Sequence, residues 1–197
     1  MMRPSFGPRC EWDTQWMAGE VIPEEFESML TGGHPNSLGH TVDVVAAVLA
    51  DRTRLAQLYA CYFSSDEVVR LRTSSAMKRV TAEHPDWTME FMDRLQNEVA
   101  AIDQASTQWT LAILFDLTKE LQSAAQRVRS VQIMQQNVAH HDDWIVLNTT
   151  MQVLHRWSLD DPVLAAWLRP HLERLTCDRR KSVAAKATAL RAASTSN

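Results

Sequence analysis

The densest group of side chains able to do chemistry is the run His140-His141-Asp142-Asp143. Imidazole nitrogens and carboxylate oxygens are ligands for zinc and iron, but the side chains of adjacent residues point apart and rarely bind one ion. The run also has the residue types of a helix boundary, with histidines ending one helix and aspartates starting the next. We therefore interpret it as a boundary and predict neither a metal site nor a cofactor.

Sequence motifs typical of catalytic sites are absent or occur without the motifs that normally accompany them. The sequence contains no H-E-x-x-H motif, no G-x-S-x-G motif and no glycine-rich phosphate loop. Ser75 and Lys78 match S-x-x-K, but the S-D-N and K-T-G motifs that accompany it in penicillin-binding enzymes are missing. The acidic pairs 142–143 and 160–161 fit helix starts better than a general acid and base. We predict no catalytic residues, and an enzyme is the less favoured class.

Glycine is scarce among the 197 residues and unevenly placed. The chain has only five glycines, at Gly7, Gly19, Gly32, Gly33 and Gly39. Hairpins, bulges and phosphate loops depend on glycine. The lack of glycine after Gly39 therefore disfavours barrels, sandwiches, Rossmann folds and P-loops. The composition, with 45% hydrophobic and 22% charged residues, is that of a globular chain.

Charge is unevenly distributed although the formal net charge is only −4. Residues 1–50 carry two arginines against seven acidic residues, whereas residues 169–197 carry seven cations against two acids. The acidic N-terminal part and the basic C-terminal part can attract each other within one chain or between two copies, or each can face its own partner. The sequence therefore leaves the oligomeric state open. The three cysteines have no C-x-x-C spacing, and no apolar run is long enough to span a bilayer. We expect a cytoplasmic protein without a membrane-bound segment.

Hydrophobic periodicity and capping residues predict a chain of helices with short breaks. Acidic or hydroxyl residues mark the expected starts, among them Asp66, Asp103, Ser123, Asp143 and Asp161. The predicted helices cover residues 23–30, 37–50, 51–63, 65–83, 86–101, 103–121, 123–140, 142–158, 160–176 and 178–193. Residues 1–36 form a lead with a short helix, in which Trp12, Trp16, Phe26 and Leu30 favour a capping role; residues 37–197 form the main array.

A repeat of nearly forty residues runs through this array. Four anchor residues near the starts of helices, Val69, Ser106, Val146 and Val183, are separated by 37, 40 and 37 residues. Seven positions after each anchor come Ala76, Ile113, Val153 and Leu190, and the preceding helices repeat through Leu58, Leu95, Met134 and Leu172. Each unit is therefore a helix pair whose apolar face is buried by stacking on its neighbours, as in an α-solenoid.

The motif Asp66-x-x-Val69-Arg70 at the start of a second helix resembles the HEAT repeat, and residues 178–183 are similar to it. The second unit departs from the pattern, with Ser106-Thr107 in place of Val-Arg. The stretch from about 37 to 193 resembles small bacterial HEAT-like proteins. The resemblance implies an all-α fold: a right-handed α-α superhelix, a HEAT-like solenoid of about four helix pairs with an N-terminal helical cap.

In HEAT-like stacks the second helices line the concave face, which is the usual binding surface. By this resemblance the candidate partner-binding residues lie near the starts of the second helices: Arg70, Thr73, Gln104, Gln108, Trp109, Asp143, Trp144, Asn148, Arg179, Arg180 and Lys181. Arginine and tryptophan are enriched at the energetic centres of interfaces. The alternative is that the arginines pair with aspartates of adjacent repeats and the tryptophans fill the core.

We predict a non-catalytic interaction scaffold that binds a protein partner in its concave groove. The alternative is an enzyme similar to the alkylpurine DNA glycosylases, or a nucleic-acid-binding module, because those glycosylases are also small HEAT-like solenoids with an aspartate and tryptophans in a basic cleft. Asp103, Trp109 and Trp144 would supply those residue types here. The tryptophan-rich catalytic segment of that family has no counterpart in this sequence, and the net charge is negative.

Overall fold

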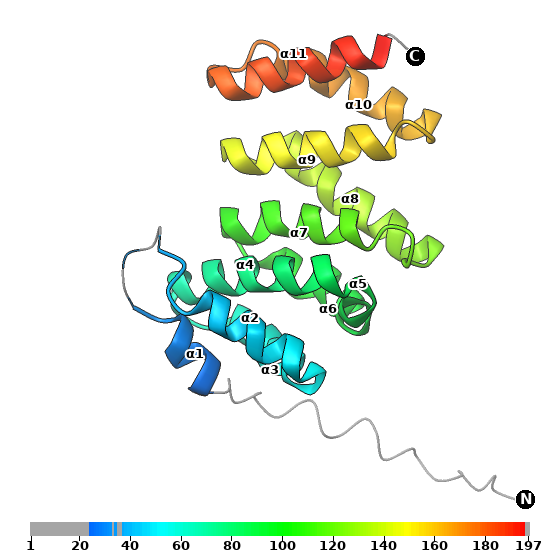
Figure 1. Cartoon of the computed structure of the whole chain (residues 1–197). Helices are drawn as coiled ribbons and strands as arrows, with labels where there is room; N and C mark the ends of the chain where they lie inside the picture. Colours follow the sequence, from blue (N-terminus) through cyan, green and yellow to red (C-terminus); the bar gives the residue numbers. More distant parts are fainter. Residues whose placement is uncertain (1–23, 33, 35–36, 196–197) are drawn as a thin grey trace, which may run out of the picture.

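The computed structural model describes residues 24–195 except 33, 35 and 36, and every regular element in these residues is a helix (Figure 1). The α-helices are α1 Glu24–Leu30, α2 Thr41–Ala50, α3 Leu55–Ala60, α4 Glu67–Glu83, α5 Pro85–Thr88, α6 Met92–Asn97, α7 Ala105–Leu117, α8 Ala124–His140, α9 Trp144–Trp157, α10 Pro162–Leu175 and α11 Lys181–Thr195. Most of the predicted lead, including Trp12 and Trp16, lies outside the described residues. An all-α fold is confirmed.

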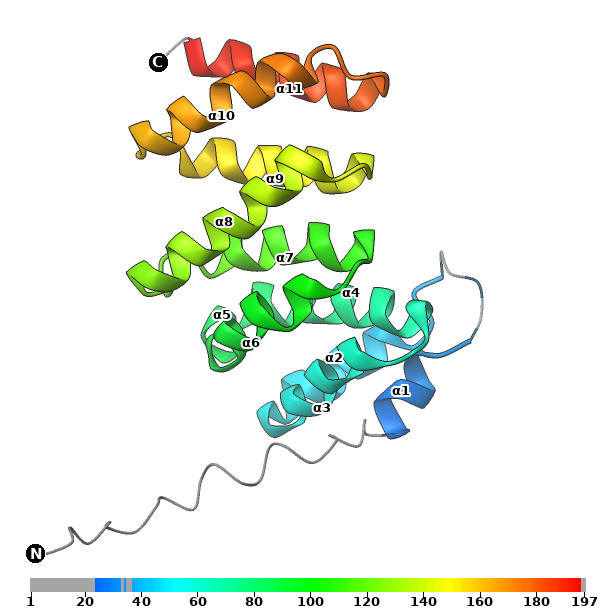
Figure 2. The same ribbon diagram turned by 180° about the vertical axis from the view of Figure 1, so that it is seen from behind.

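The helices form an elongated stack of two layers (Figures 1 and 2). One layer contains α4, α7, α9 and α11, each packed against the next, and α2 packs against α4 at the N-terminal end. The other layer contains α3, α6, α8 and α10. The helices α3, α8 and α10 pack against α4, α9 and α11, whereas α6 packs against α8 and reaches α7 through the 3₁₀ turn Val99–Ala101 that follows it. The four anchor residues of the sequence repeat are buried near the starts of α4, α7, α9 and α11. Stacking of successive helix pairs therefore creates the core.

Side-chain caps set the starts of four of the longer helices, as the sequence indicates. The side chains of Asp66, Ser123, Asp143 and Asp161 accept backbone N–H groups in the first turns of α4, α8, α9 and α10. Asp103 does not cap α7, because Gln104 occupies that position without a side-chain cap bond. The two predicted helices over 51–63 and 86–101 are also wrong in detail, since each is broken by 3₁₀ turns. No glycine or proline stands at those breaks, so periodicity alone predicted continuous helices.

The buried side chain of Arg72 links the N-terminal helix α1 to α4 of the stack. Arg72 of α4 is only 1% exposed, and its guanidinium donates to the carbonyl oxygens of Leu30, Gly32 and Ser37 at 2.7, 2.6 and 3.1 Å. The carbonyls at the end of a helix carry partial negative charge, which favours a cation there. Phe26 is buried in the same region, and α1 contacts both α2 and α4. The segment after α1 thus folds around a side chain of the array.

Candidate interaction surface

Arg70 and Gln104 are brought together between α4 and α7, but they bind each other. Arg70 Nε donates to Gln104 Oε1 at 2.6 Å, and its Nη1 donates to the Ser64 carbonyl at 2.7 Å. The Gln104 amide donates in turn to the Glu67 carbonyl at 3.0 Å and to Ser106 Oγ at 2.7 Å. The two residues therefore bridge neighbouring helix starts, with both amide N–H groups of Gln104 engaged and the Arg70 guanidinium held by two hydrogen bonds within the fold.

Thr73 and Gln108 do not lie on an accessible surface, which corrects the sequence-based expectation. Thr73 is fully buried and its hydroxyl donates to the Val69 carbonyl at 2.8 Å. Gln108 is also buried; its amide donates to the Ala100 and Ile102 carbonyls at 2.9 and 2.8 Å. The physical reason is that α4 and α7 are covered by the other layer and by neighbouring helices in their own layer. Only a narrow strip of each helix faces outward.

Trp109 and Asn148 are half-buried on neighbouring helices of this layer. The Lys78 ammonium lies 5.0 Å from the centroid of the Trp109 ring, a cation–π contact. Burial lowers the pKa of Lys78, and the charge of Arg79 lowers it further. Asn148 Oδ1 is buried without a hydrogen-bond partner among the described residues. Both side chains thus contribute to packing as well as to the surface.

The start of α9 presents one capping residue and one exposed aromatic residue. Asp143 Oδ1 accepts the amides of Ile145 and Val146 at 2.7 and 3.1 Å, so Asp143 is engaged as the helix cap. Trp144, the first residue of α9, is 50% exposed. Tryptophan is enriched at the energetic centres of protein interfaces, so Trp144 is a candidate for contact with another molecule.

The three basic residues at the start of α11 comprise one cation that is paired and two that are exposed. Arg180 forms a bidentate pair with Asp178, with Nε–Oδ1 and Nη2–Oδ2 distances of 2.8 and 2.7 Å. Hydrogen bonds from Arg180 lower the pKa of Asp178 to about 2. Arg180 also donates to the carbonyl of Asp142, which joins the segments preceding α9 and α11. Arg179 and Lys181 are exposed beside it.

The accessible part of the predicted set is therefore Trp144, Arg179 and Lys181, which we call the edge patch. The Arg180–Asp142 hydrogen bond and the packing of α9 against α11 place these helix starts side by side. An exposed indole and two exposed cations at neighbouring helix starts are suited to an acidic partner with an apolar side chain.

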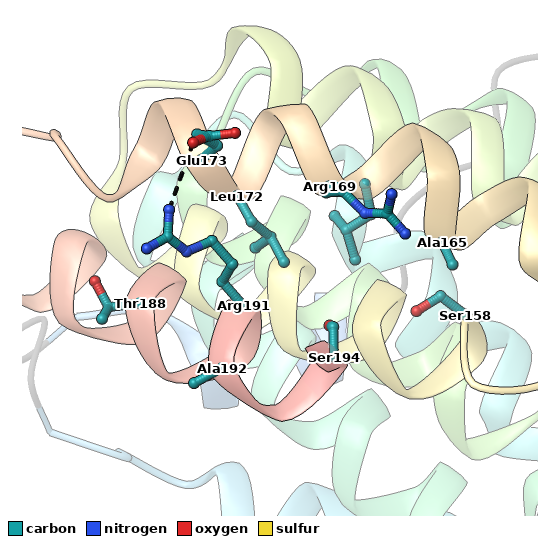
Figure 3. A pocket seen from close by; sticks show the side chains of 10 residues that line it. Ser158, Ala165, Arg169, Leu172, Glu173, Thr188, Arg191, Ala192 and Ser194 are labelled. Carbon is teal, nitrogen blue, oxygen red and sulfur yellow. Dashed lines mark ion pairs between the residues drawn. The ribbon is translucent and has the colours of Figure 1, made fainter. Parts of the chain in front are cut away.

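Two hollows were missed by sequence reasoning, and none of the eleven predicted residues lines either. A cleft of about 800 Å³ lies between α10 and α11, lined in part by Arg169, Leu172 and Arg191 (Figure 3). A groove of about 450 Å³ lies beside Lys119 and Trp157. The lining residues of each hollow come from different helices, and only Leu172 among them is a repeat position identified from the sequence, so no local signal could have identified the hollows.

Residues in the run 140–143 form local hydrogen bonds at the boundary between α8 and α9. His141 Nδ1 accepts the backbone amide of Asp143 at 2.9 Å, while Asp143 caps α9. Within the part of the chain that the structure describes, no three histidine, cysteine or acidic side chains are grouped so that they could hold a metal ion. No described helix has the length and apolarity needed to cross a bilayer.

Comparison with known proteins identifies no relative of this chain. No protein-family model, curated protein or solved structure matches this chain.

Proposed function

We propose that this protein is a non-catalytic cytoplasmic scaffold of the HEAT-like class, a right-handed solenoid of four helix pairs with an N-terminal cap, that binds a protein partner. The 37- to 40-residue spacing of the anchors and the packing of α4, α7, α9 and α11 in one layer support the proposal. In such arrays the second helices form a continuous binding surface.

The edge patch is the observation that carries this proposal. Trp144 is 50% exposed although it is one of the largest apolar side chains, and Arg179 and Lys181 lie near it without an acidic partner among the described residues. Tryptophan and arginine supply most binding energy at protein interfaces, and exposed charges select a partner of opposite sign. The proposed partner therefore presents an acidic segment with at least one apolar side chain.

Site-specific crosslinking tests the proposal. A photo-crosslinking amino acid at residue 144 should give a discrete protein adduct in extract of the source organism. The same amino acid at Val128, which is exposed on α8, is the matched control and should not give that adduct. Combining Arg179→Glu with Lys181→Glu should reduce the adduct by about tenfold, which corresponds to about 1.4 kcal/mol of binding energy. Equal adducts at 144 and 128, or no effect of the charge reversals, would contradict the proposal.

A nucleic-acid-binding module is the second candidate, because Arg179 and Lys181 can contact phosphates and Trp144 can stack on a base. The other two residues of that hypothesis are less suited to it: Asp103 is exposed, and Trp109 already contacts Lys78. Binding of a labelled oligonucleotide at rising salt separates the two candidates. Nucleic-acid binding weakens steeply with salt concentration, and a complete absence of binding at low salt would eliminate this candidate.

A further inference from the structure

The cleft between α10 and α11 combines an aliphatic floor with a cationic rim. Leu168 and Leu172 are buried beneath it, and Ala165 and Ala192 also line it. Its volume of about 800 Å³ is within the range of small-molecule pockets in proteins. None of its lining residues belongs to the edge patch.

The charged residues of the cleft leave one cation uncompensated. Arg191 Nη1 lies 3.6 Å from Glu173 Oε1, which is a long ion pair between two exposed side chains. Arg169 forms no ion pair or hydrogen bond with any other described residue. Figure 3 shows the Arg191–Glu173 pair on one side of Leu172 and Arg169 on the other. The lining thus carries one positive charge in excess, which suits a monoanion.

The hydroxyl groups of the cleft are already used as donors. Ser158 Oγ donates to the His155 carbonyl, Thr188 Oγ1 to the Ala184 carbonyl, and Ser194 Oγ to the Leu190 carbonyl, all within 2.9 Å. The donors that remain for a ligand are the guanidinium N–H groups, so the headgroup must be an acceptor. The lining contains no aromatic ring on which a nucleobase could stack.

We propose that this cleft binds a carboxylic acid with a linear aliphatic body. The carboxylate would accept from Arg169 and Arg191, in competition with Glu173, and the chain would lie on Leu168 and Leu172. A charge-assisted hydrogen bond orients the headgroup, while the aliphatic floor provides apolar contact.

Octanoate is a suitable probe because its headgroup and chain match these two parts of the cleft. Binding is measured by isothermal titration calorimetry and by backbone amide shifts of α10 and α11 in the full chain. Arg169→Gln should weaken octanoate binding about tenfold, by loss of a charged donor. Glu173→Gln should strengthen it about threefold, because Arg191 is then released from its competitor. Arg79→Gln, which removes an exposed arginine on α4, is the matched control and should leave the affinity unchanged.

Two comparison ligands separate the contributions of charge and chain. Octanamide has the same chain without the negative charge, and inorganic phosphate has the charge without the chain; both should bind at least tenfold more weakly than octanoate. The proposal is overturned if octanoate causes no amide shifts in α10 and α11, or if octanamide or phosphate binds as tightly. It also fails if Arg169→Gln and Arg79→Gln weaken binding equally, or if Glu173→Gln fails to strengthen it.

Discussion

The guanidinium of Arg72 lies directly against Gly39. A β-carbon at residue 39 would stand 2.9 Å from Arg72 Cζ, closer than carbon atoms pack in proteins. The guanidinium cannot move aside easily, because it also donates to carbonyl oxygens between Leu30 and Ser37. The buried cation and the absence of a side chain at Gly39 are therefore two parts of one arrangement.

Removal of this cation should detach the N-terminal helix. Arg72→Ala leaves the buried Leu30 carbonyl and several part-buried carbonyl groups without this donor, and we expect a loss of about 3 kcal/mol in the free energy of unfolding. Urea denaturation measures the loss, and limited proteolysis should show faster cleavage between residues 30 and 40. Arg79→Ala is the control on the same helix, because Arg79 is exposed, and it should cost less than about 0.5 kcal/mol. Equal stability of the two variants would refute this role of Arg72.

Gly39 and Gly32 should respond differently to alanine. Both have positive φ, at +51° and +69°, but a β-carbon at Gly32 meets no atom within 4 Å. Gly32→Ala should therefore cost about 1 kcal/mol of backbone strain, whereas Gly39→Ala should cost about 3 kcal/mol because overpacking is added. Thermal unfolding of both variants tests this difference. In an Arg72→Ala background the excess cost at Gly39 should disappear, and its persistence would show that the guanidinium is not responsible.

Gln108 should be far more important for stability than an exposed glutamine. Gln108→Leu leaves the Ala100 carbonyl and the Asn137 amide without this partner, and it removes one of the two donors to the Ile102 carbonyl. We expect a loss of about 2 kcal/mol in the free energy of unfolding. Gln136→Leu, at an exposed position of α8, makes the same chemical change and should be nearly neutral. Chemical denaturation of both variants checks the difference, and comparable losses would contradict it.

The Asp178–Arg180 pair should give stability that depends on acid pH. The pKa of Asp178 falls from its usual 3.8 to about 2 in the folded chain, so the pair stabilises the fold above pH 4. This contribution is lost as the pH falls toward 2, because the carboxylate is then protonated. Asp178→Asn should cost about 1 kcal/mol at pH 7 and almost nothing at pH 2. Denaturation across this pH range tests the prediction.

The exposed residue Asp160 provides the control for this pH dependence. Asp160→Asn should leave the difference from wild type small and constant between pH 7 and pH 2. A difference for Asp178→Asn that does not shrink with acid would mean that the pair is not the source of the effect.

Helix positions were predictable because their signals are local. The predicted range 123–140 is α8 Ala124–His140 within one residue, since Ser123 and Gln126 form a capping box that depends only on nearby atoms. The anchor positions were also predictable, because a repeat buries the same face in every unit. Asp103 was misassigned because a cap residue type indicates a helix start only to within a residue or so, and the structure places Gln104 at the cap position of α7.

The candidate site was only partly predictable. The repeat spacing predicted that Trp144 and residues 179–181 lie at the starts of second helices. In the structure Trp144, Arg179 and Lys181 are accessible there. The spacing also selected Thr73 and Gln108, which are buried. Half a helical turn, about two residues, separates outward from inward positions, and the second helix of each pair is covered on more sides than a periodicity argument assumes.

The sequence by itself determined an all-helical chain of repeating pairs, because helix starts, apolar faces and repeat spacing are encoded within a few turns of each other. Only the tertiary structure decided which arginine is buried: Arg70 bridges two helix starts, while Arg72 lies inside, two residues along the same helix. It also decided that Arg169 and Arg191 share one cleft. The physical reason is that burial and charge pairing depend on neighbours contributed by distant segments.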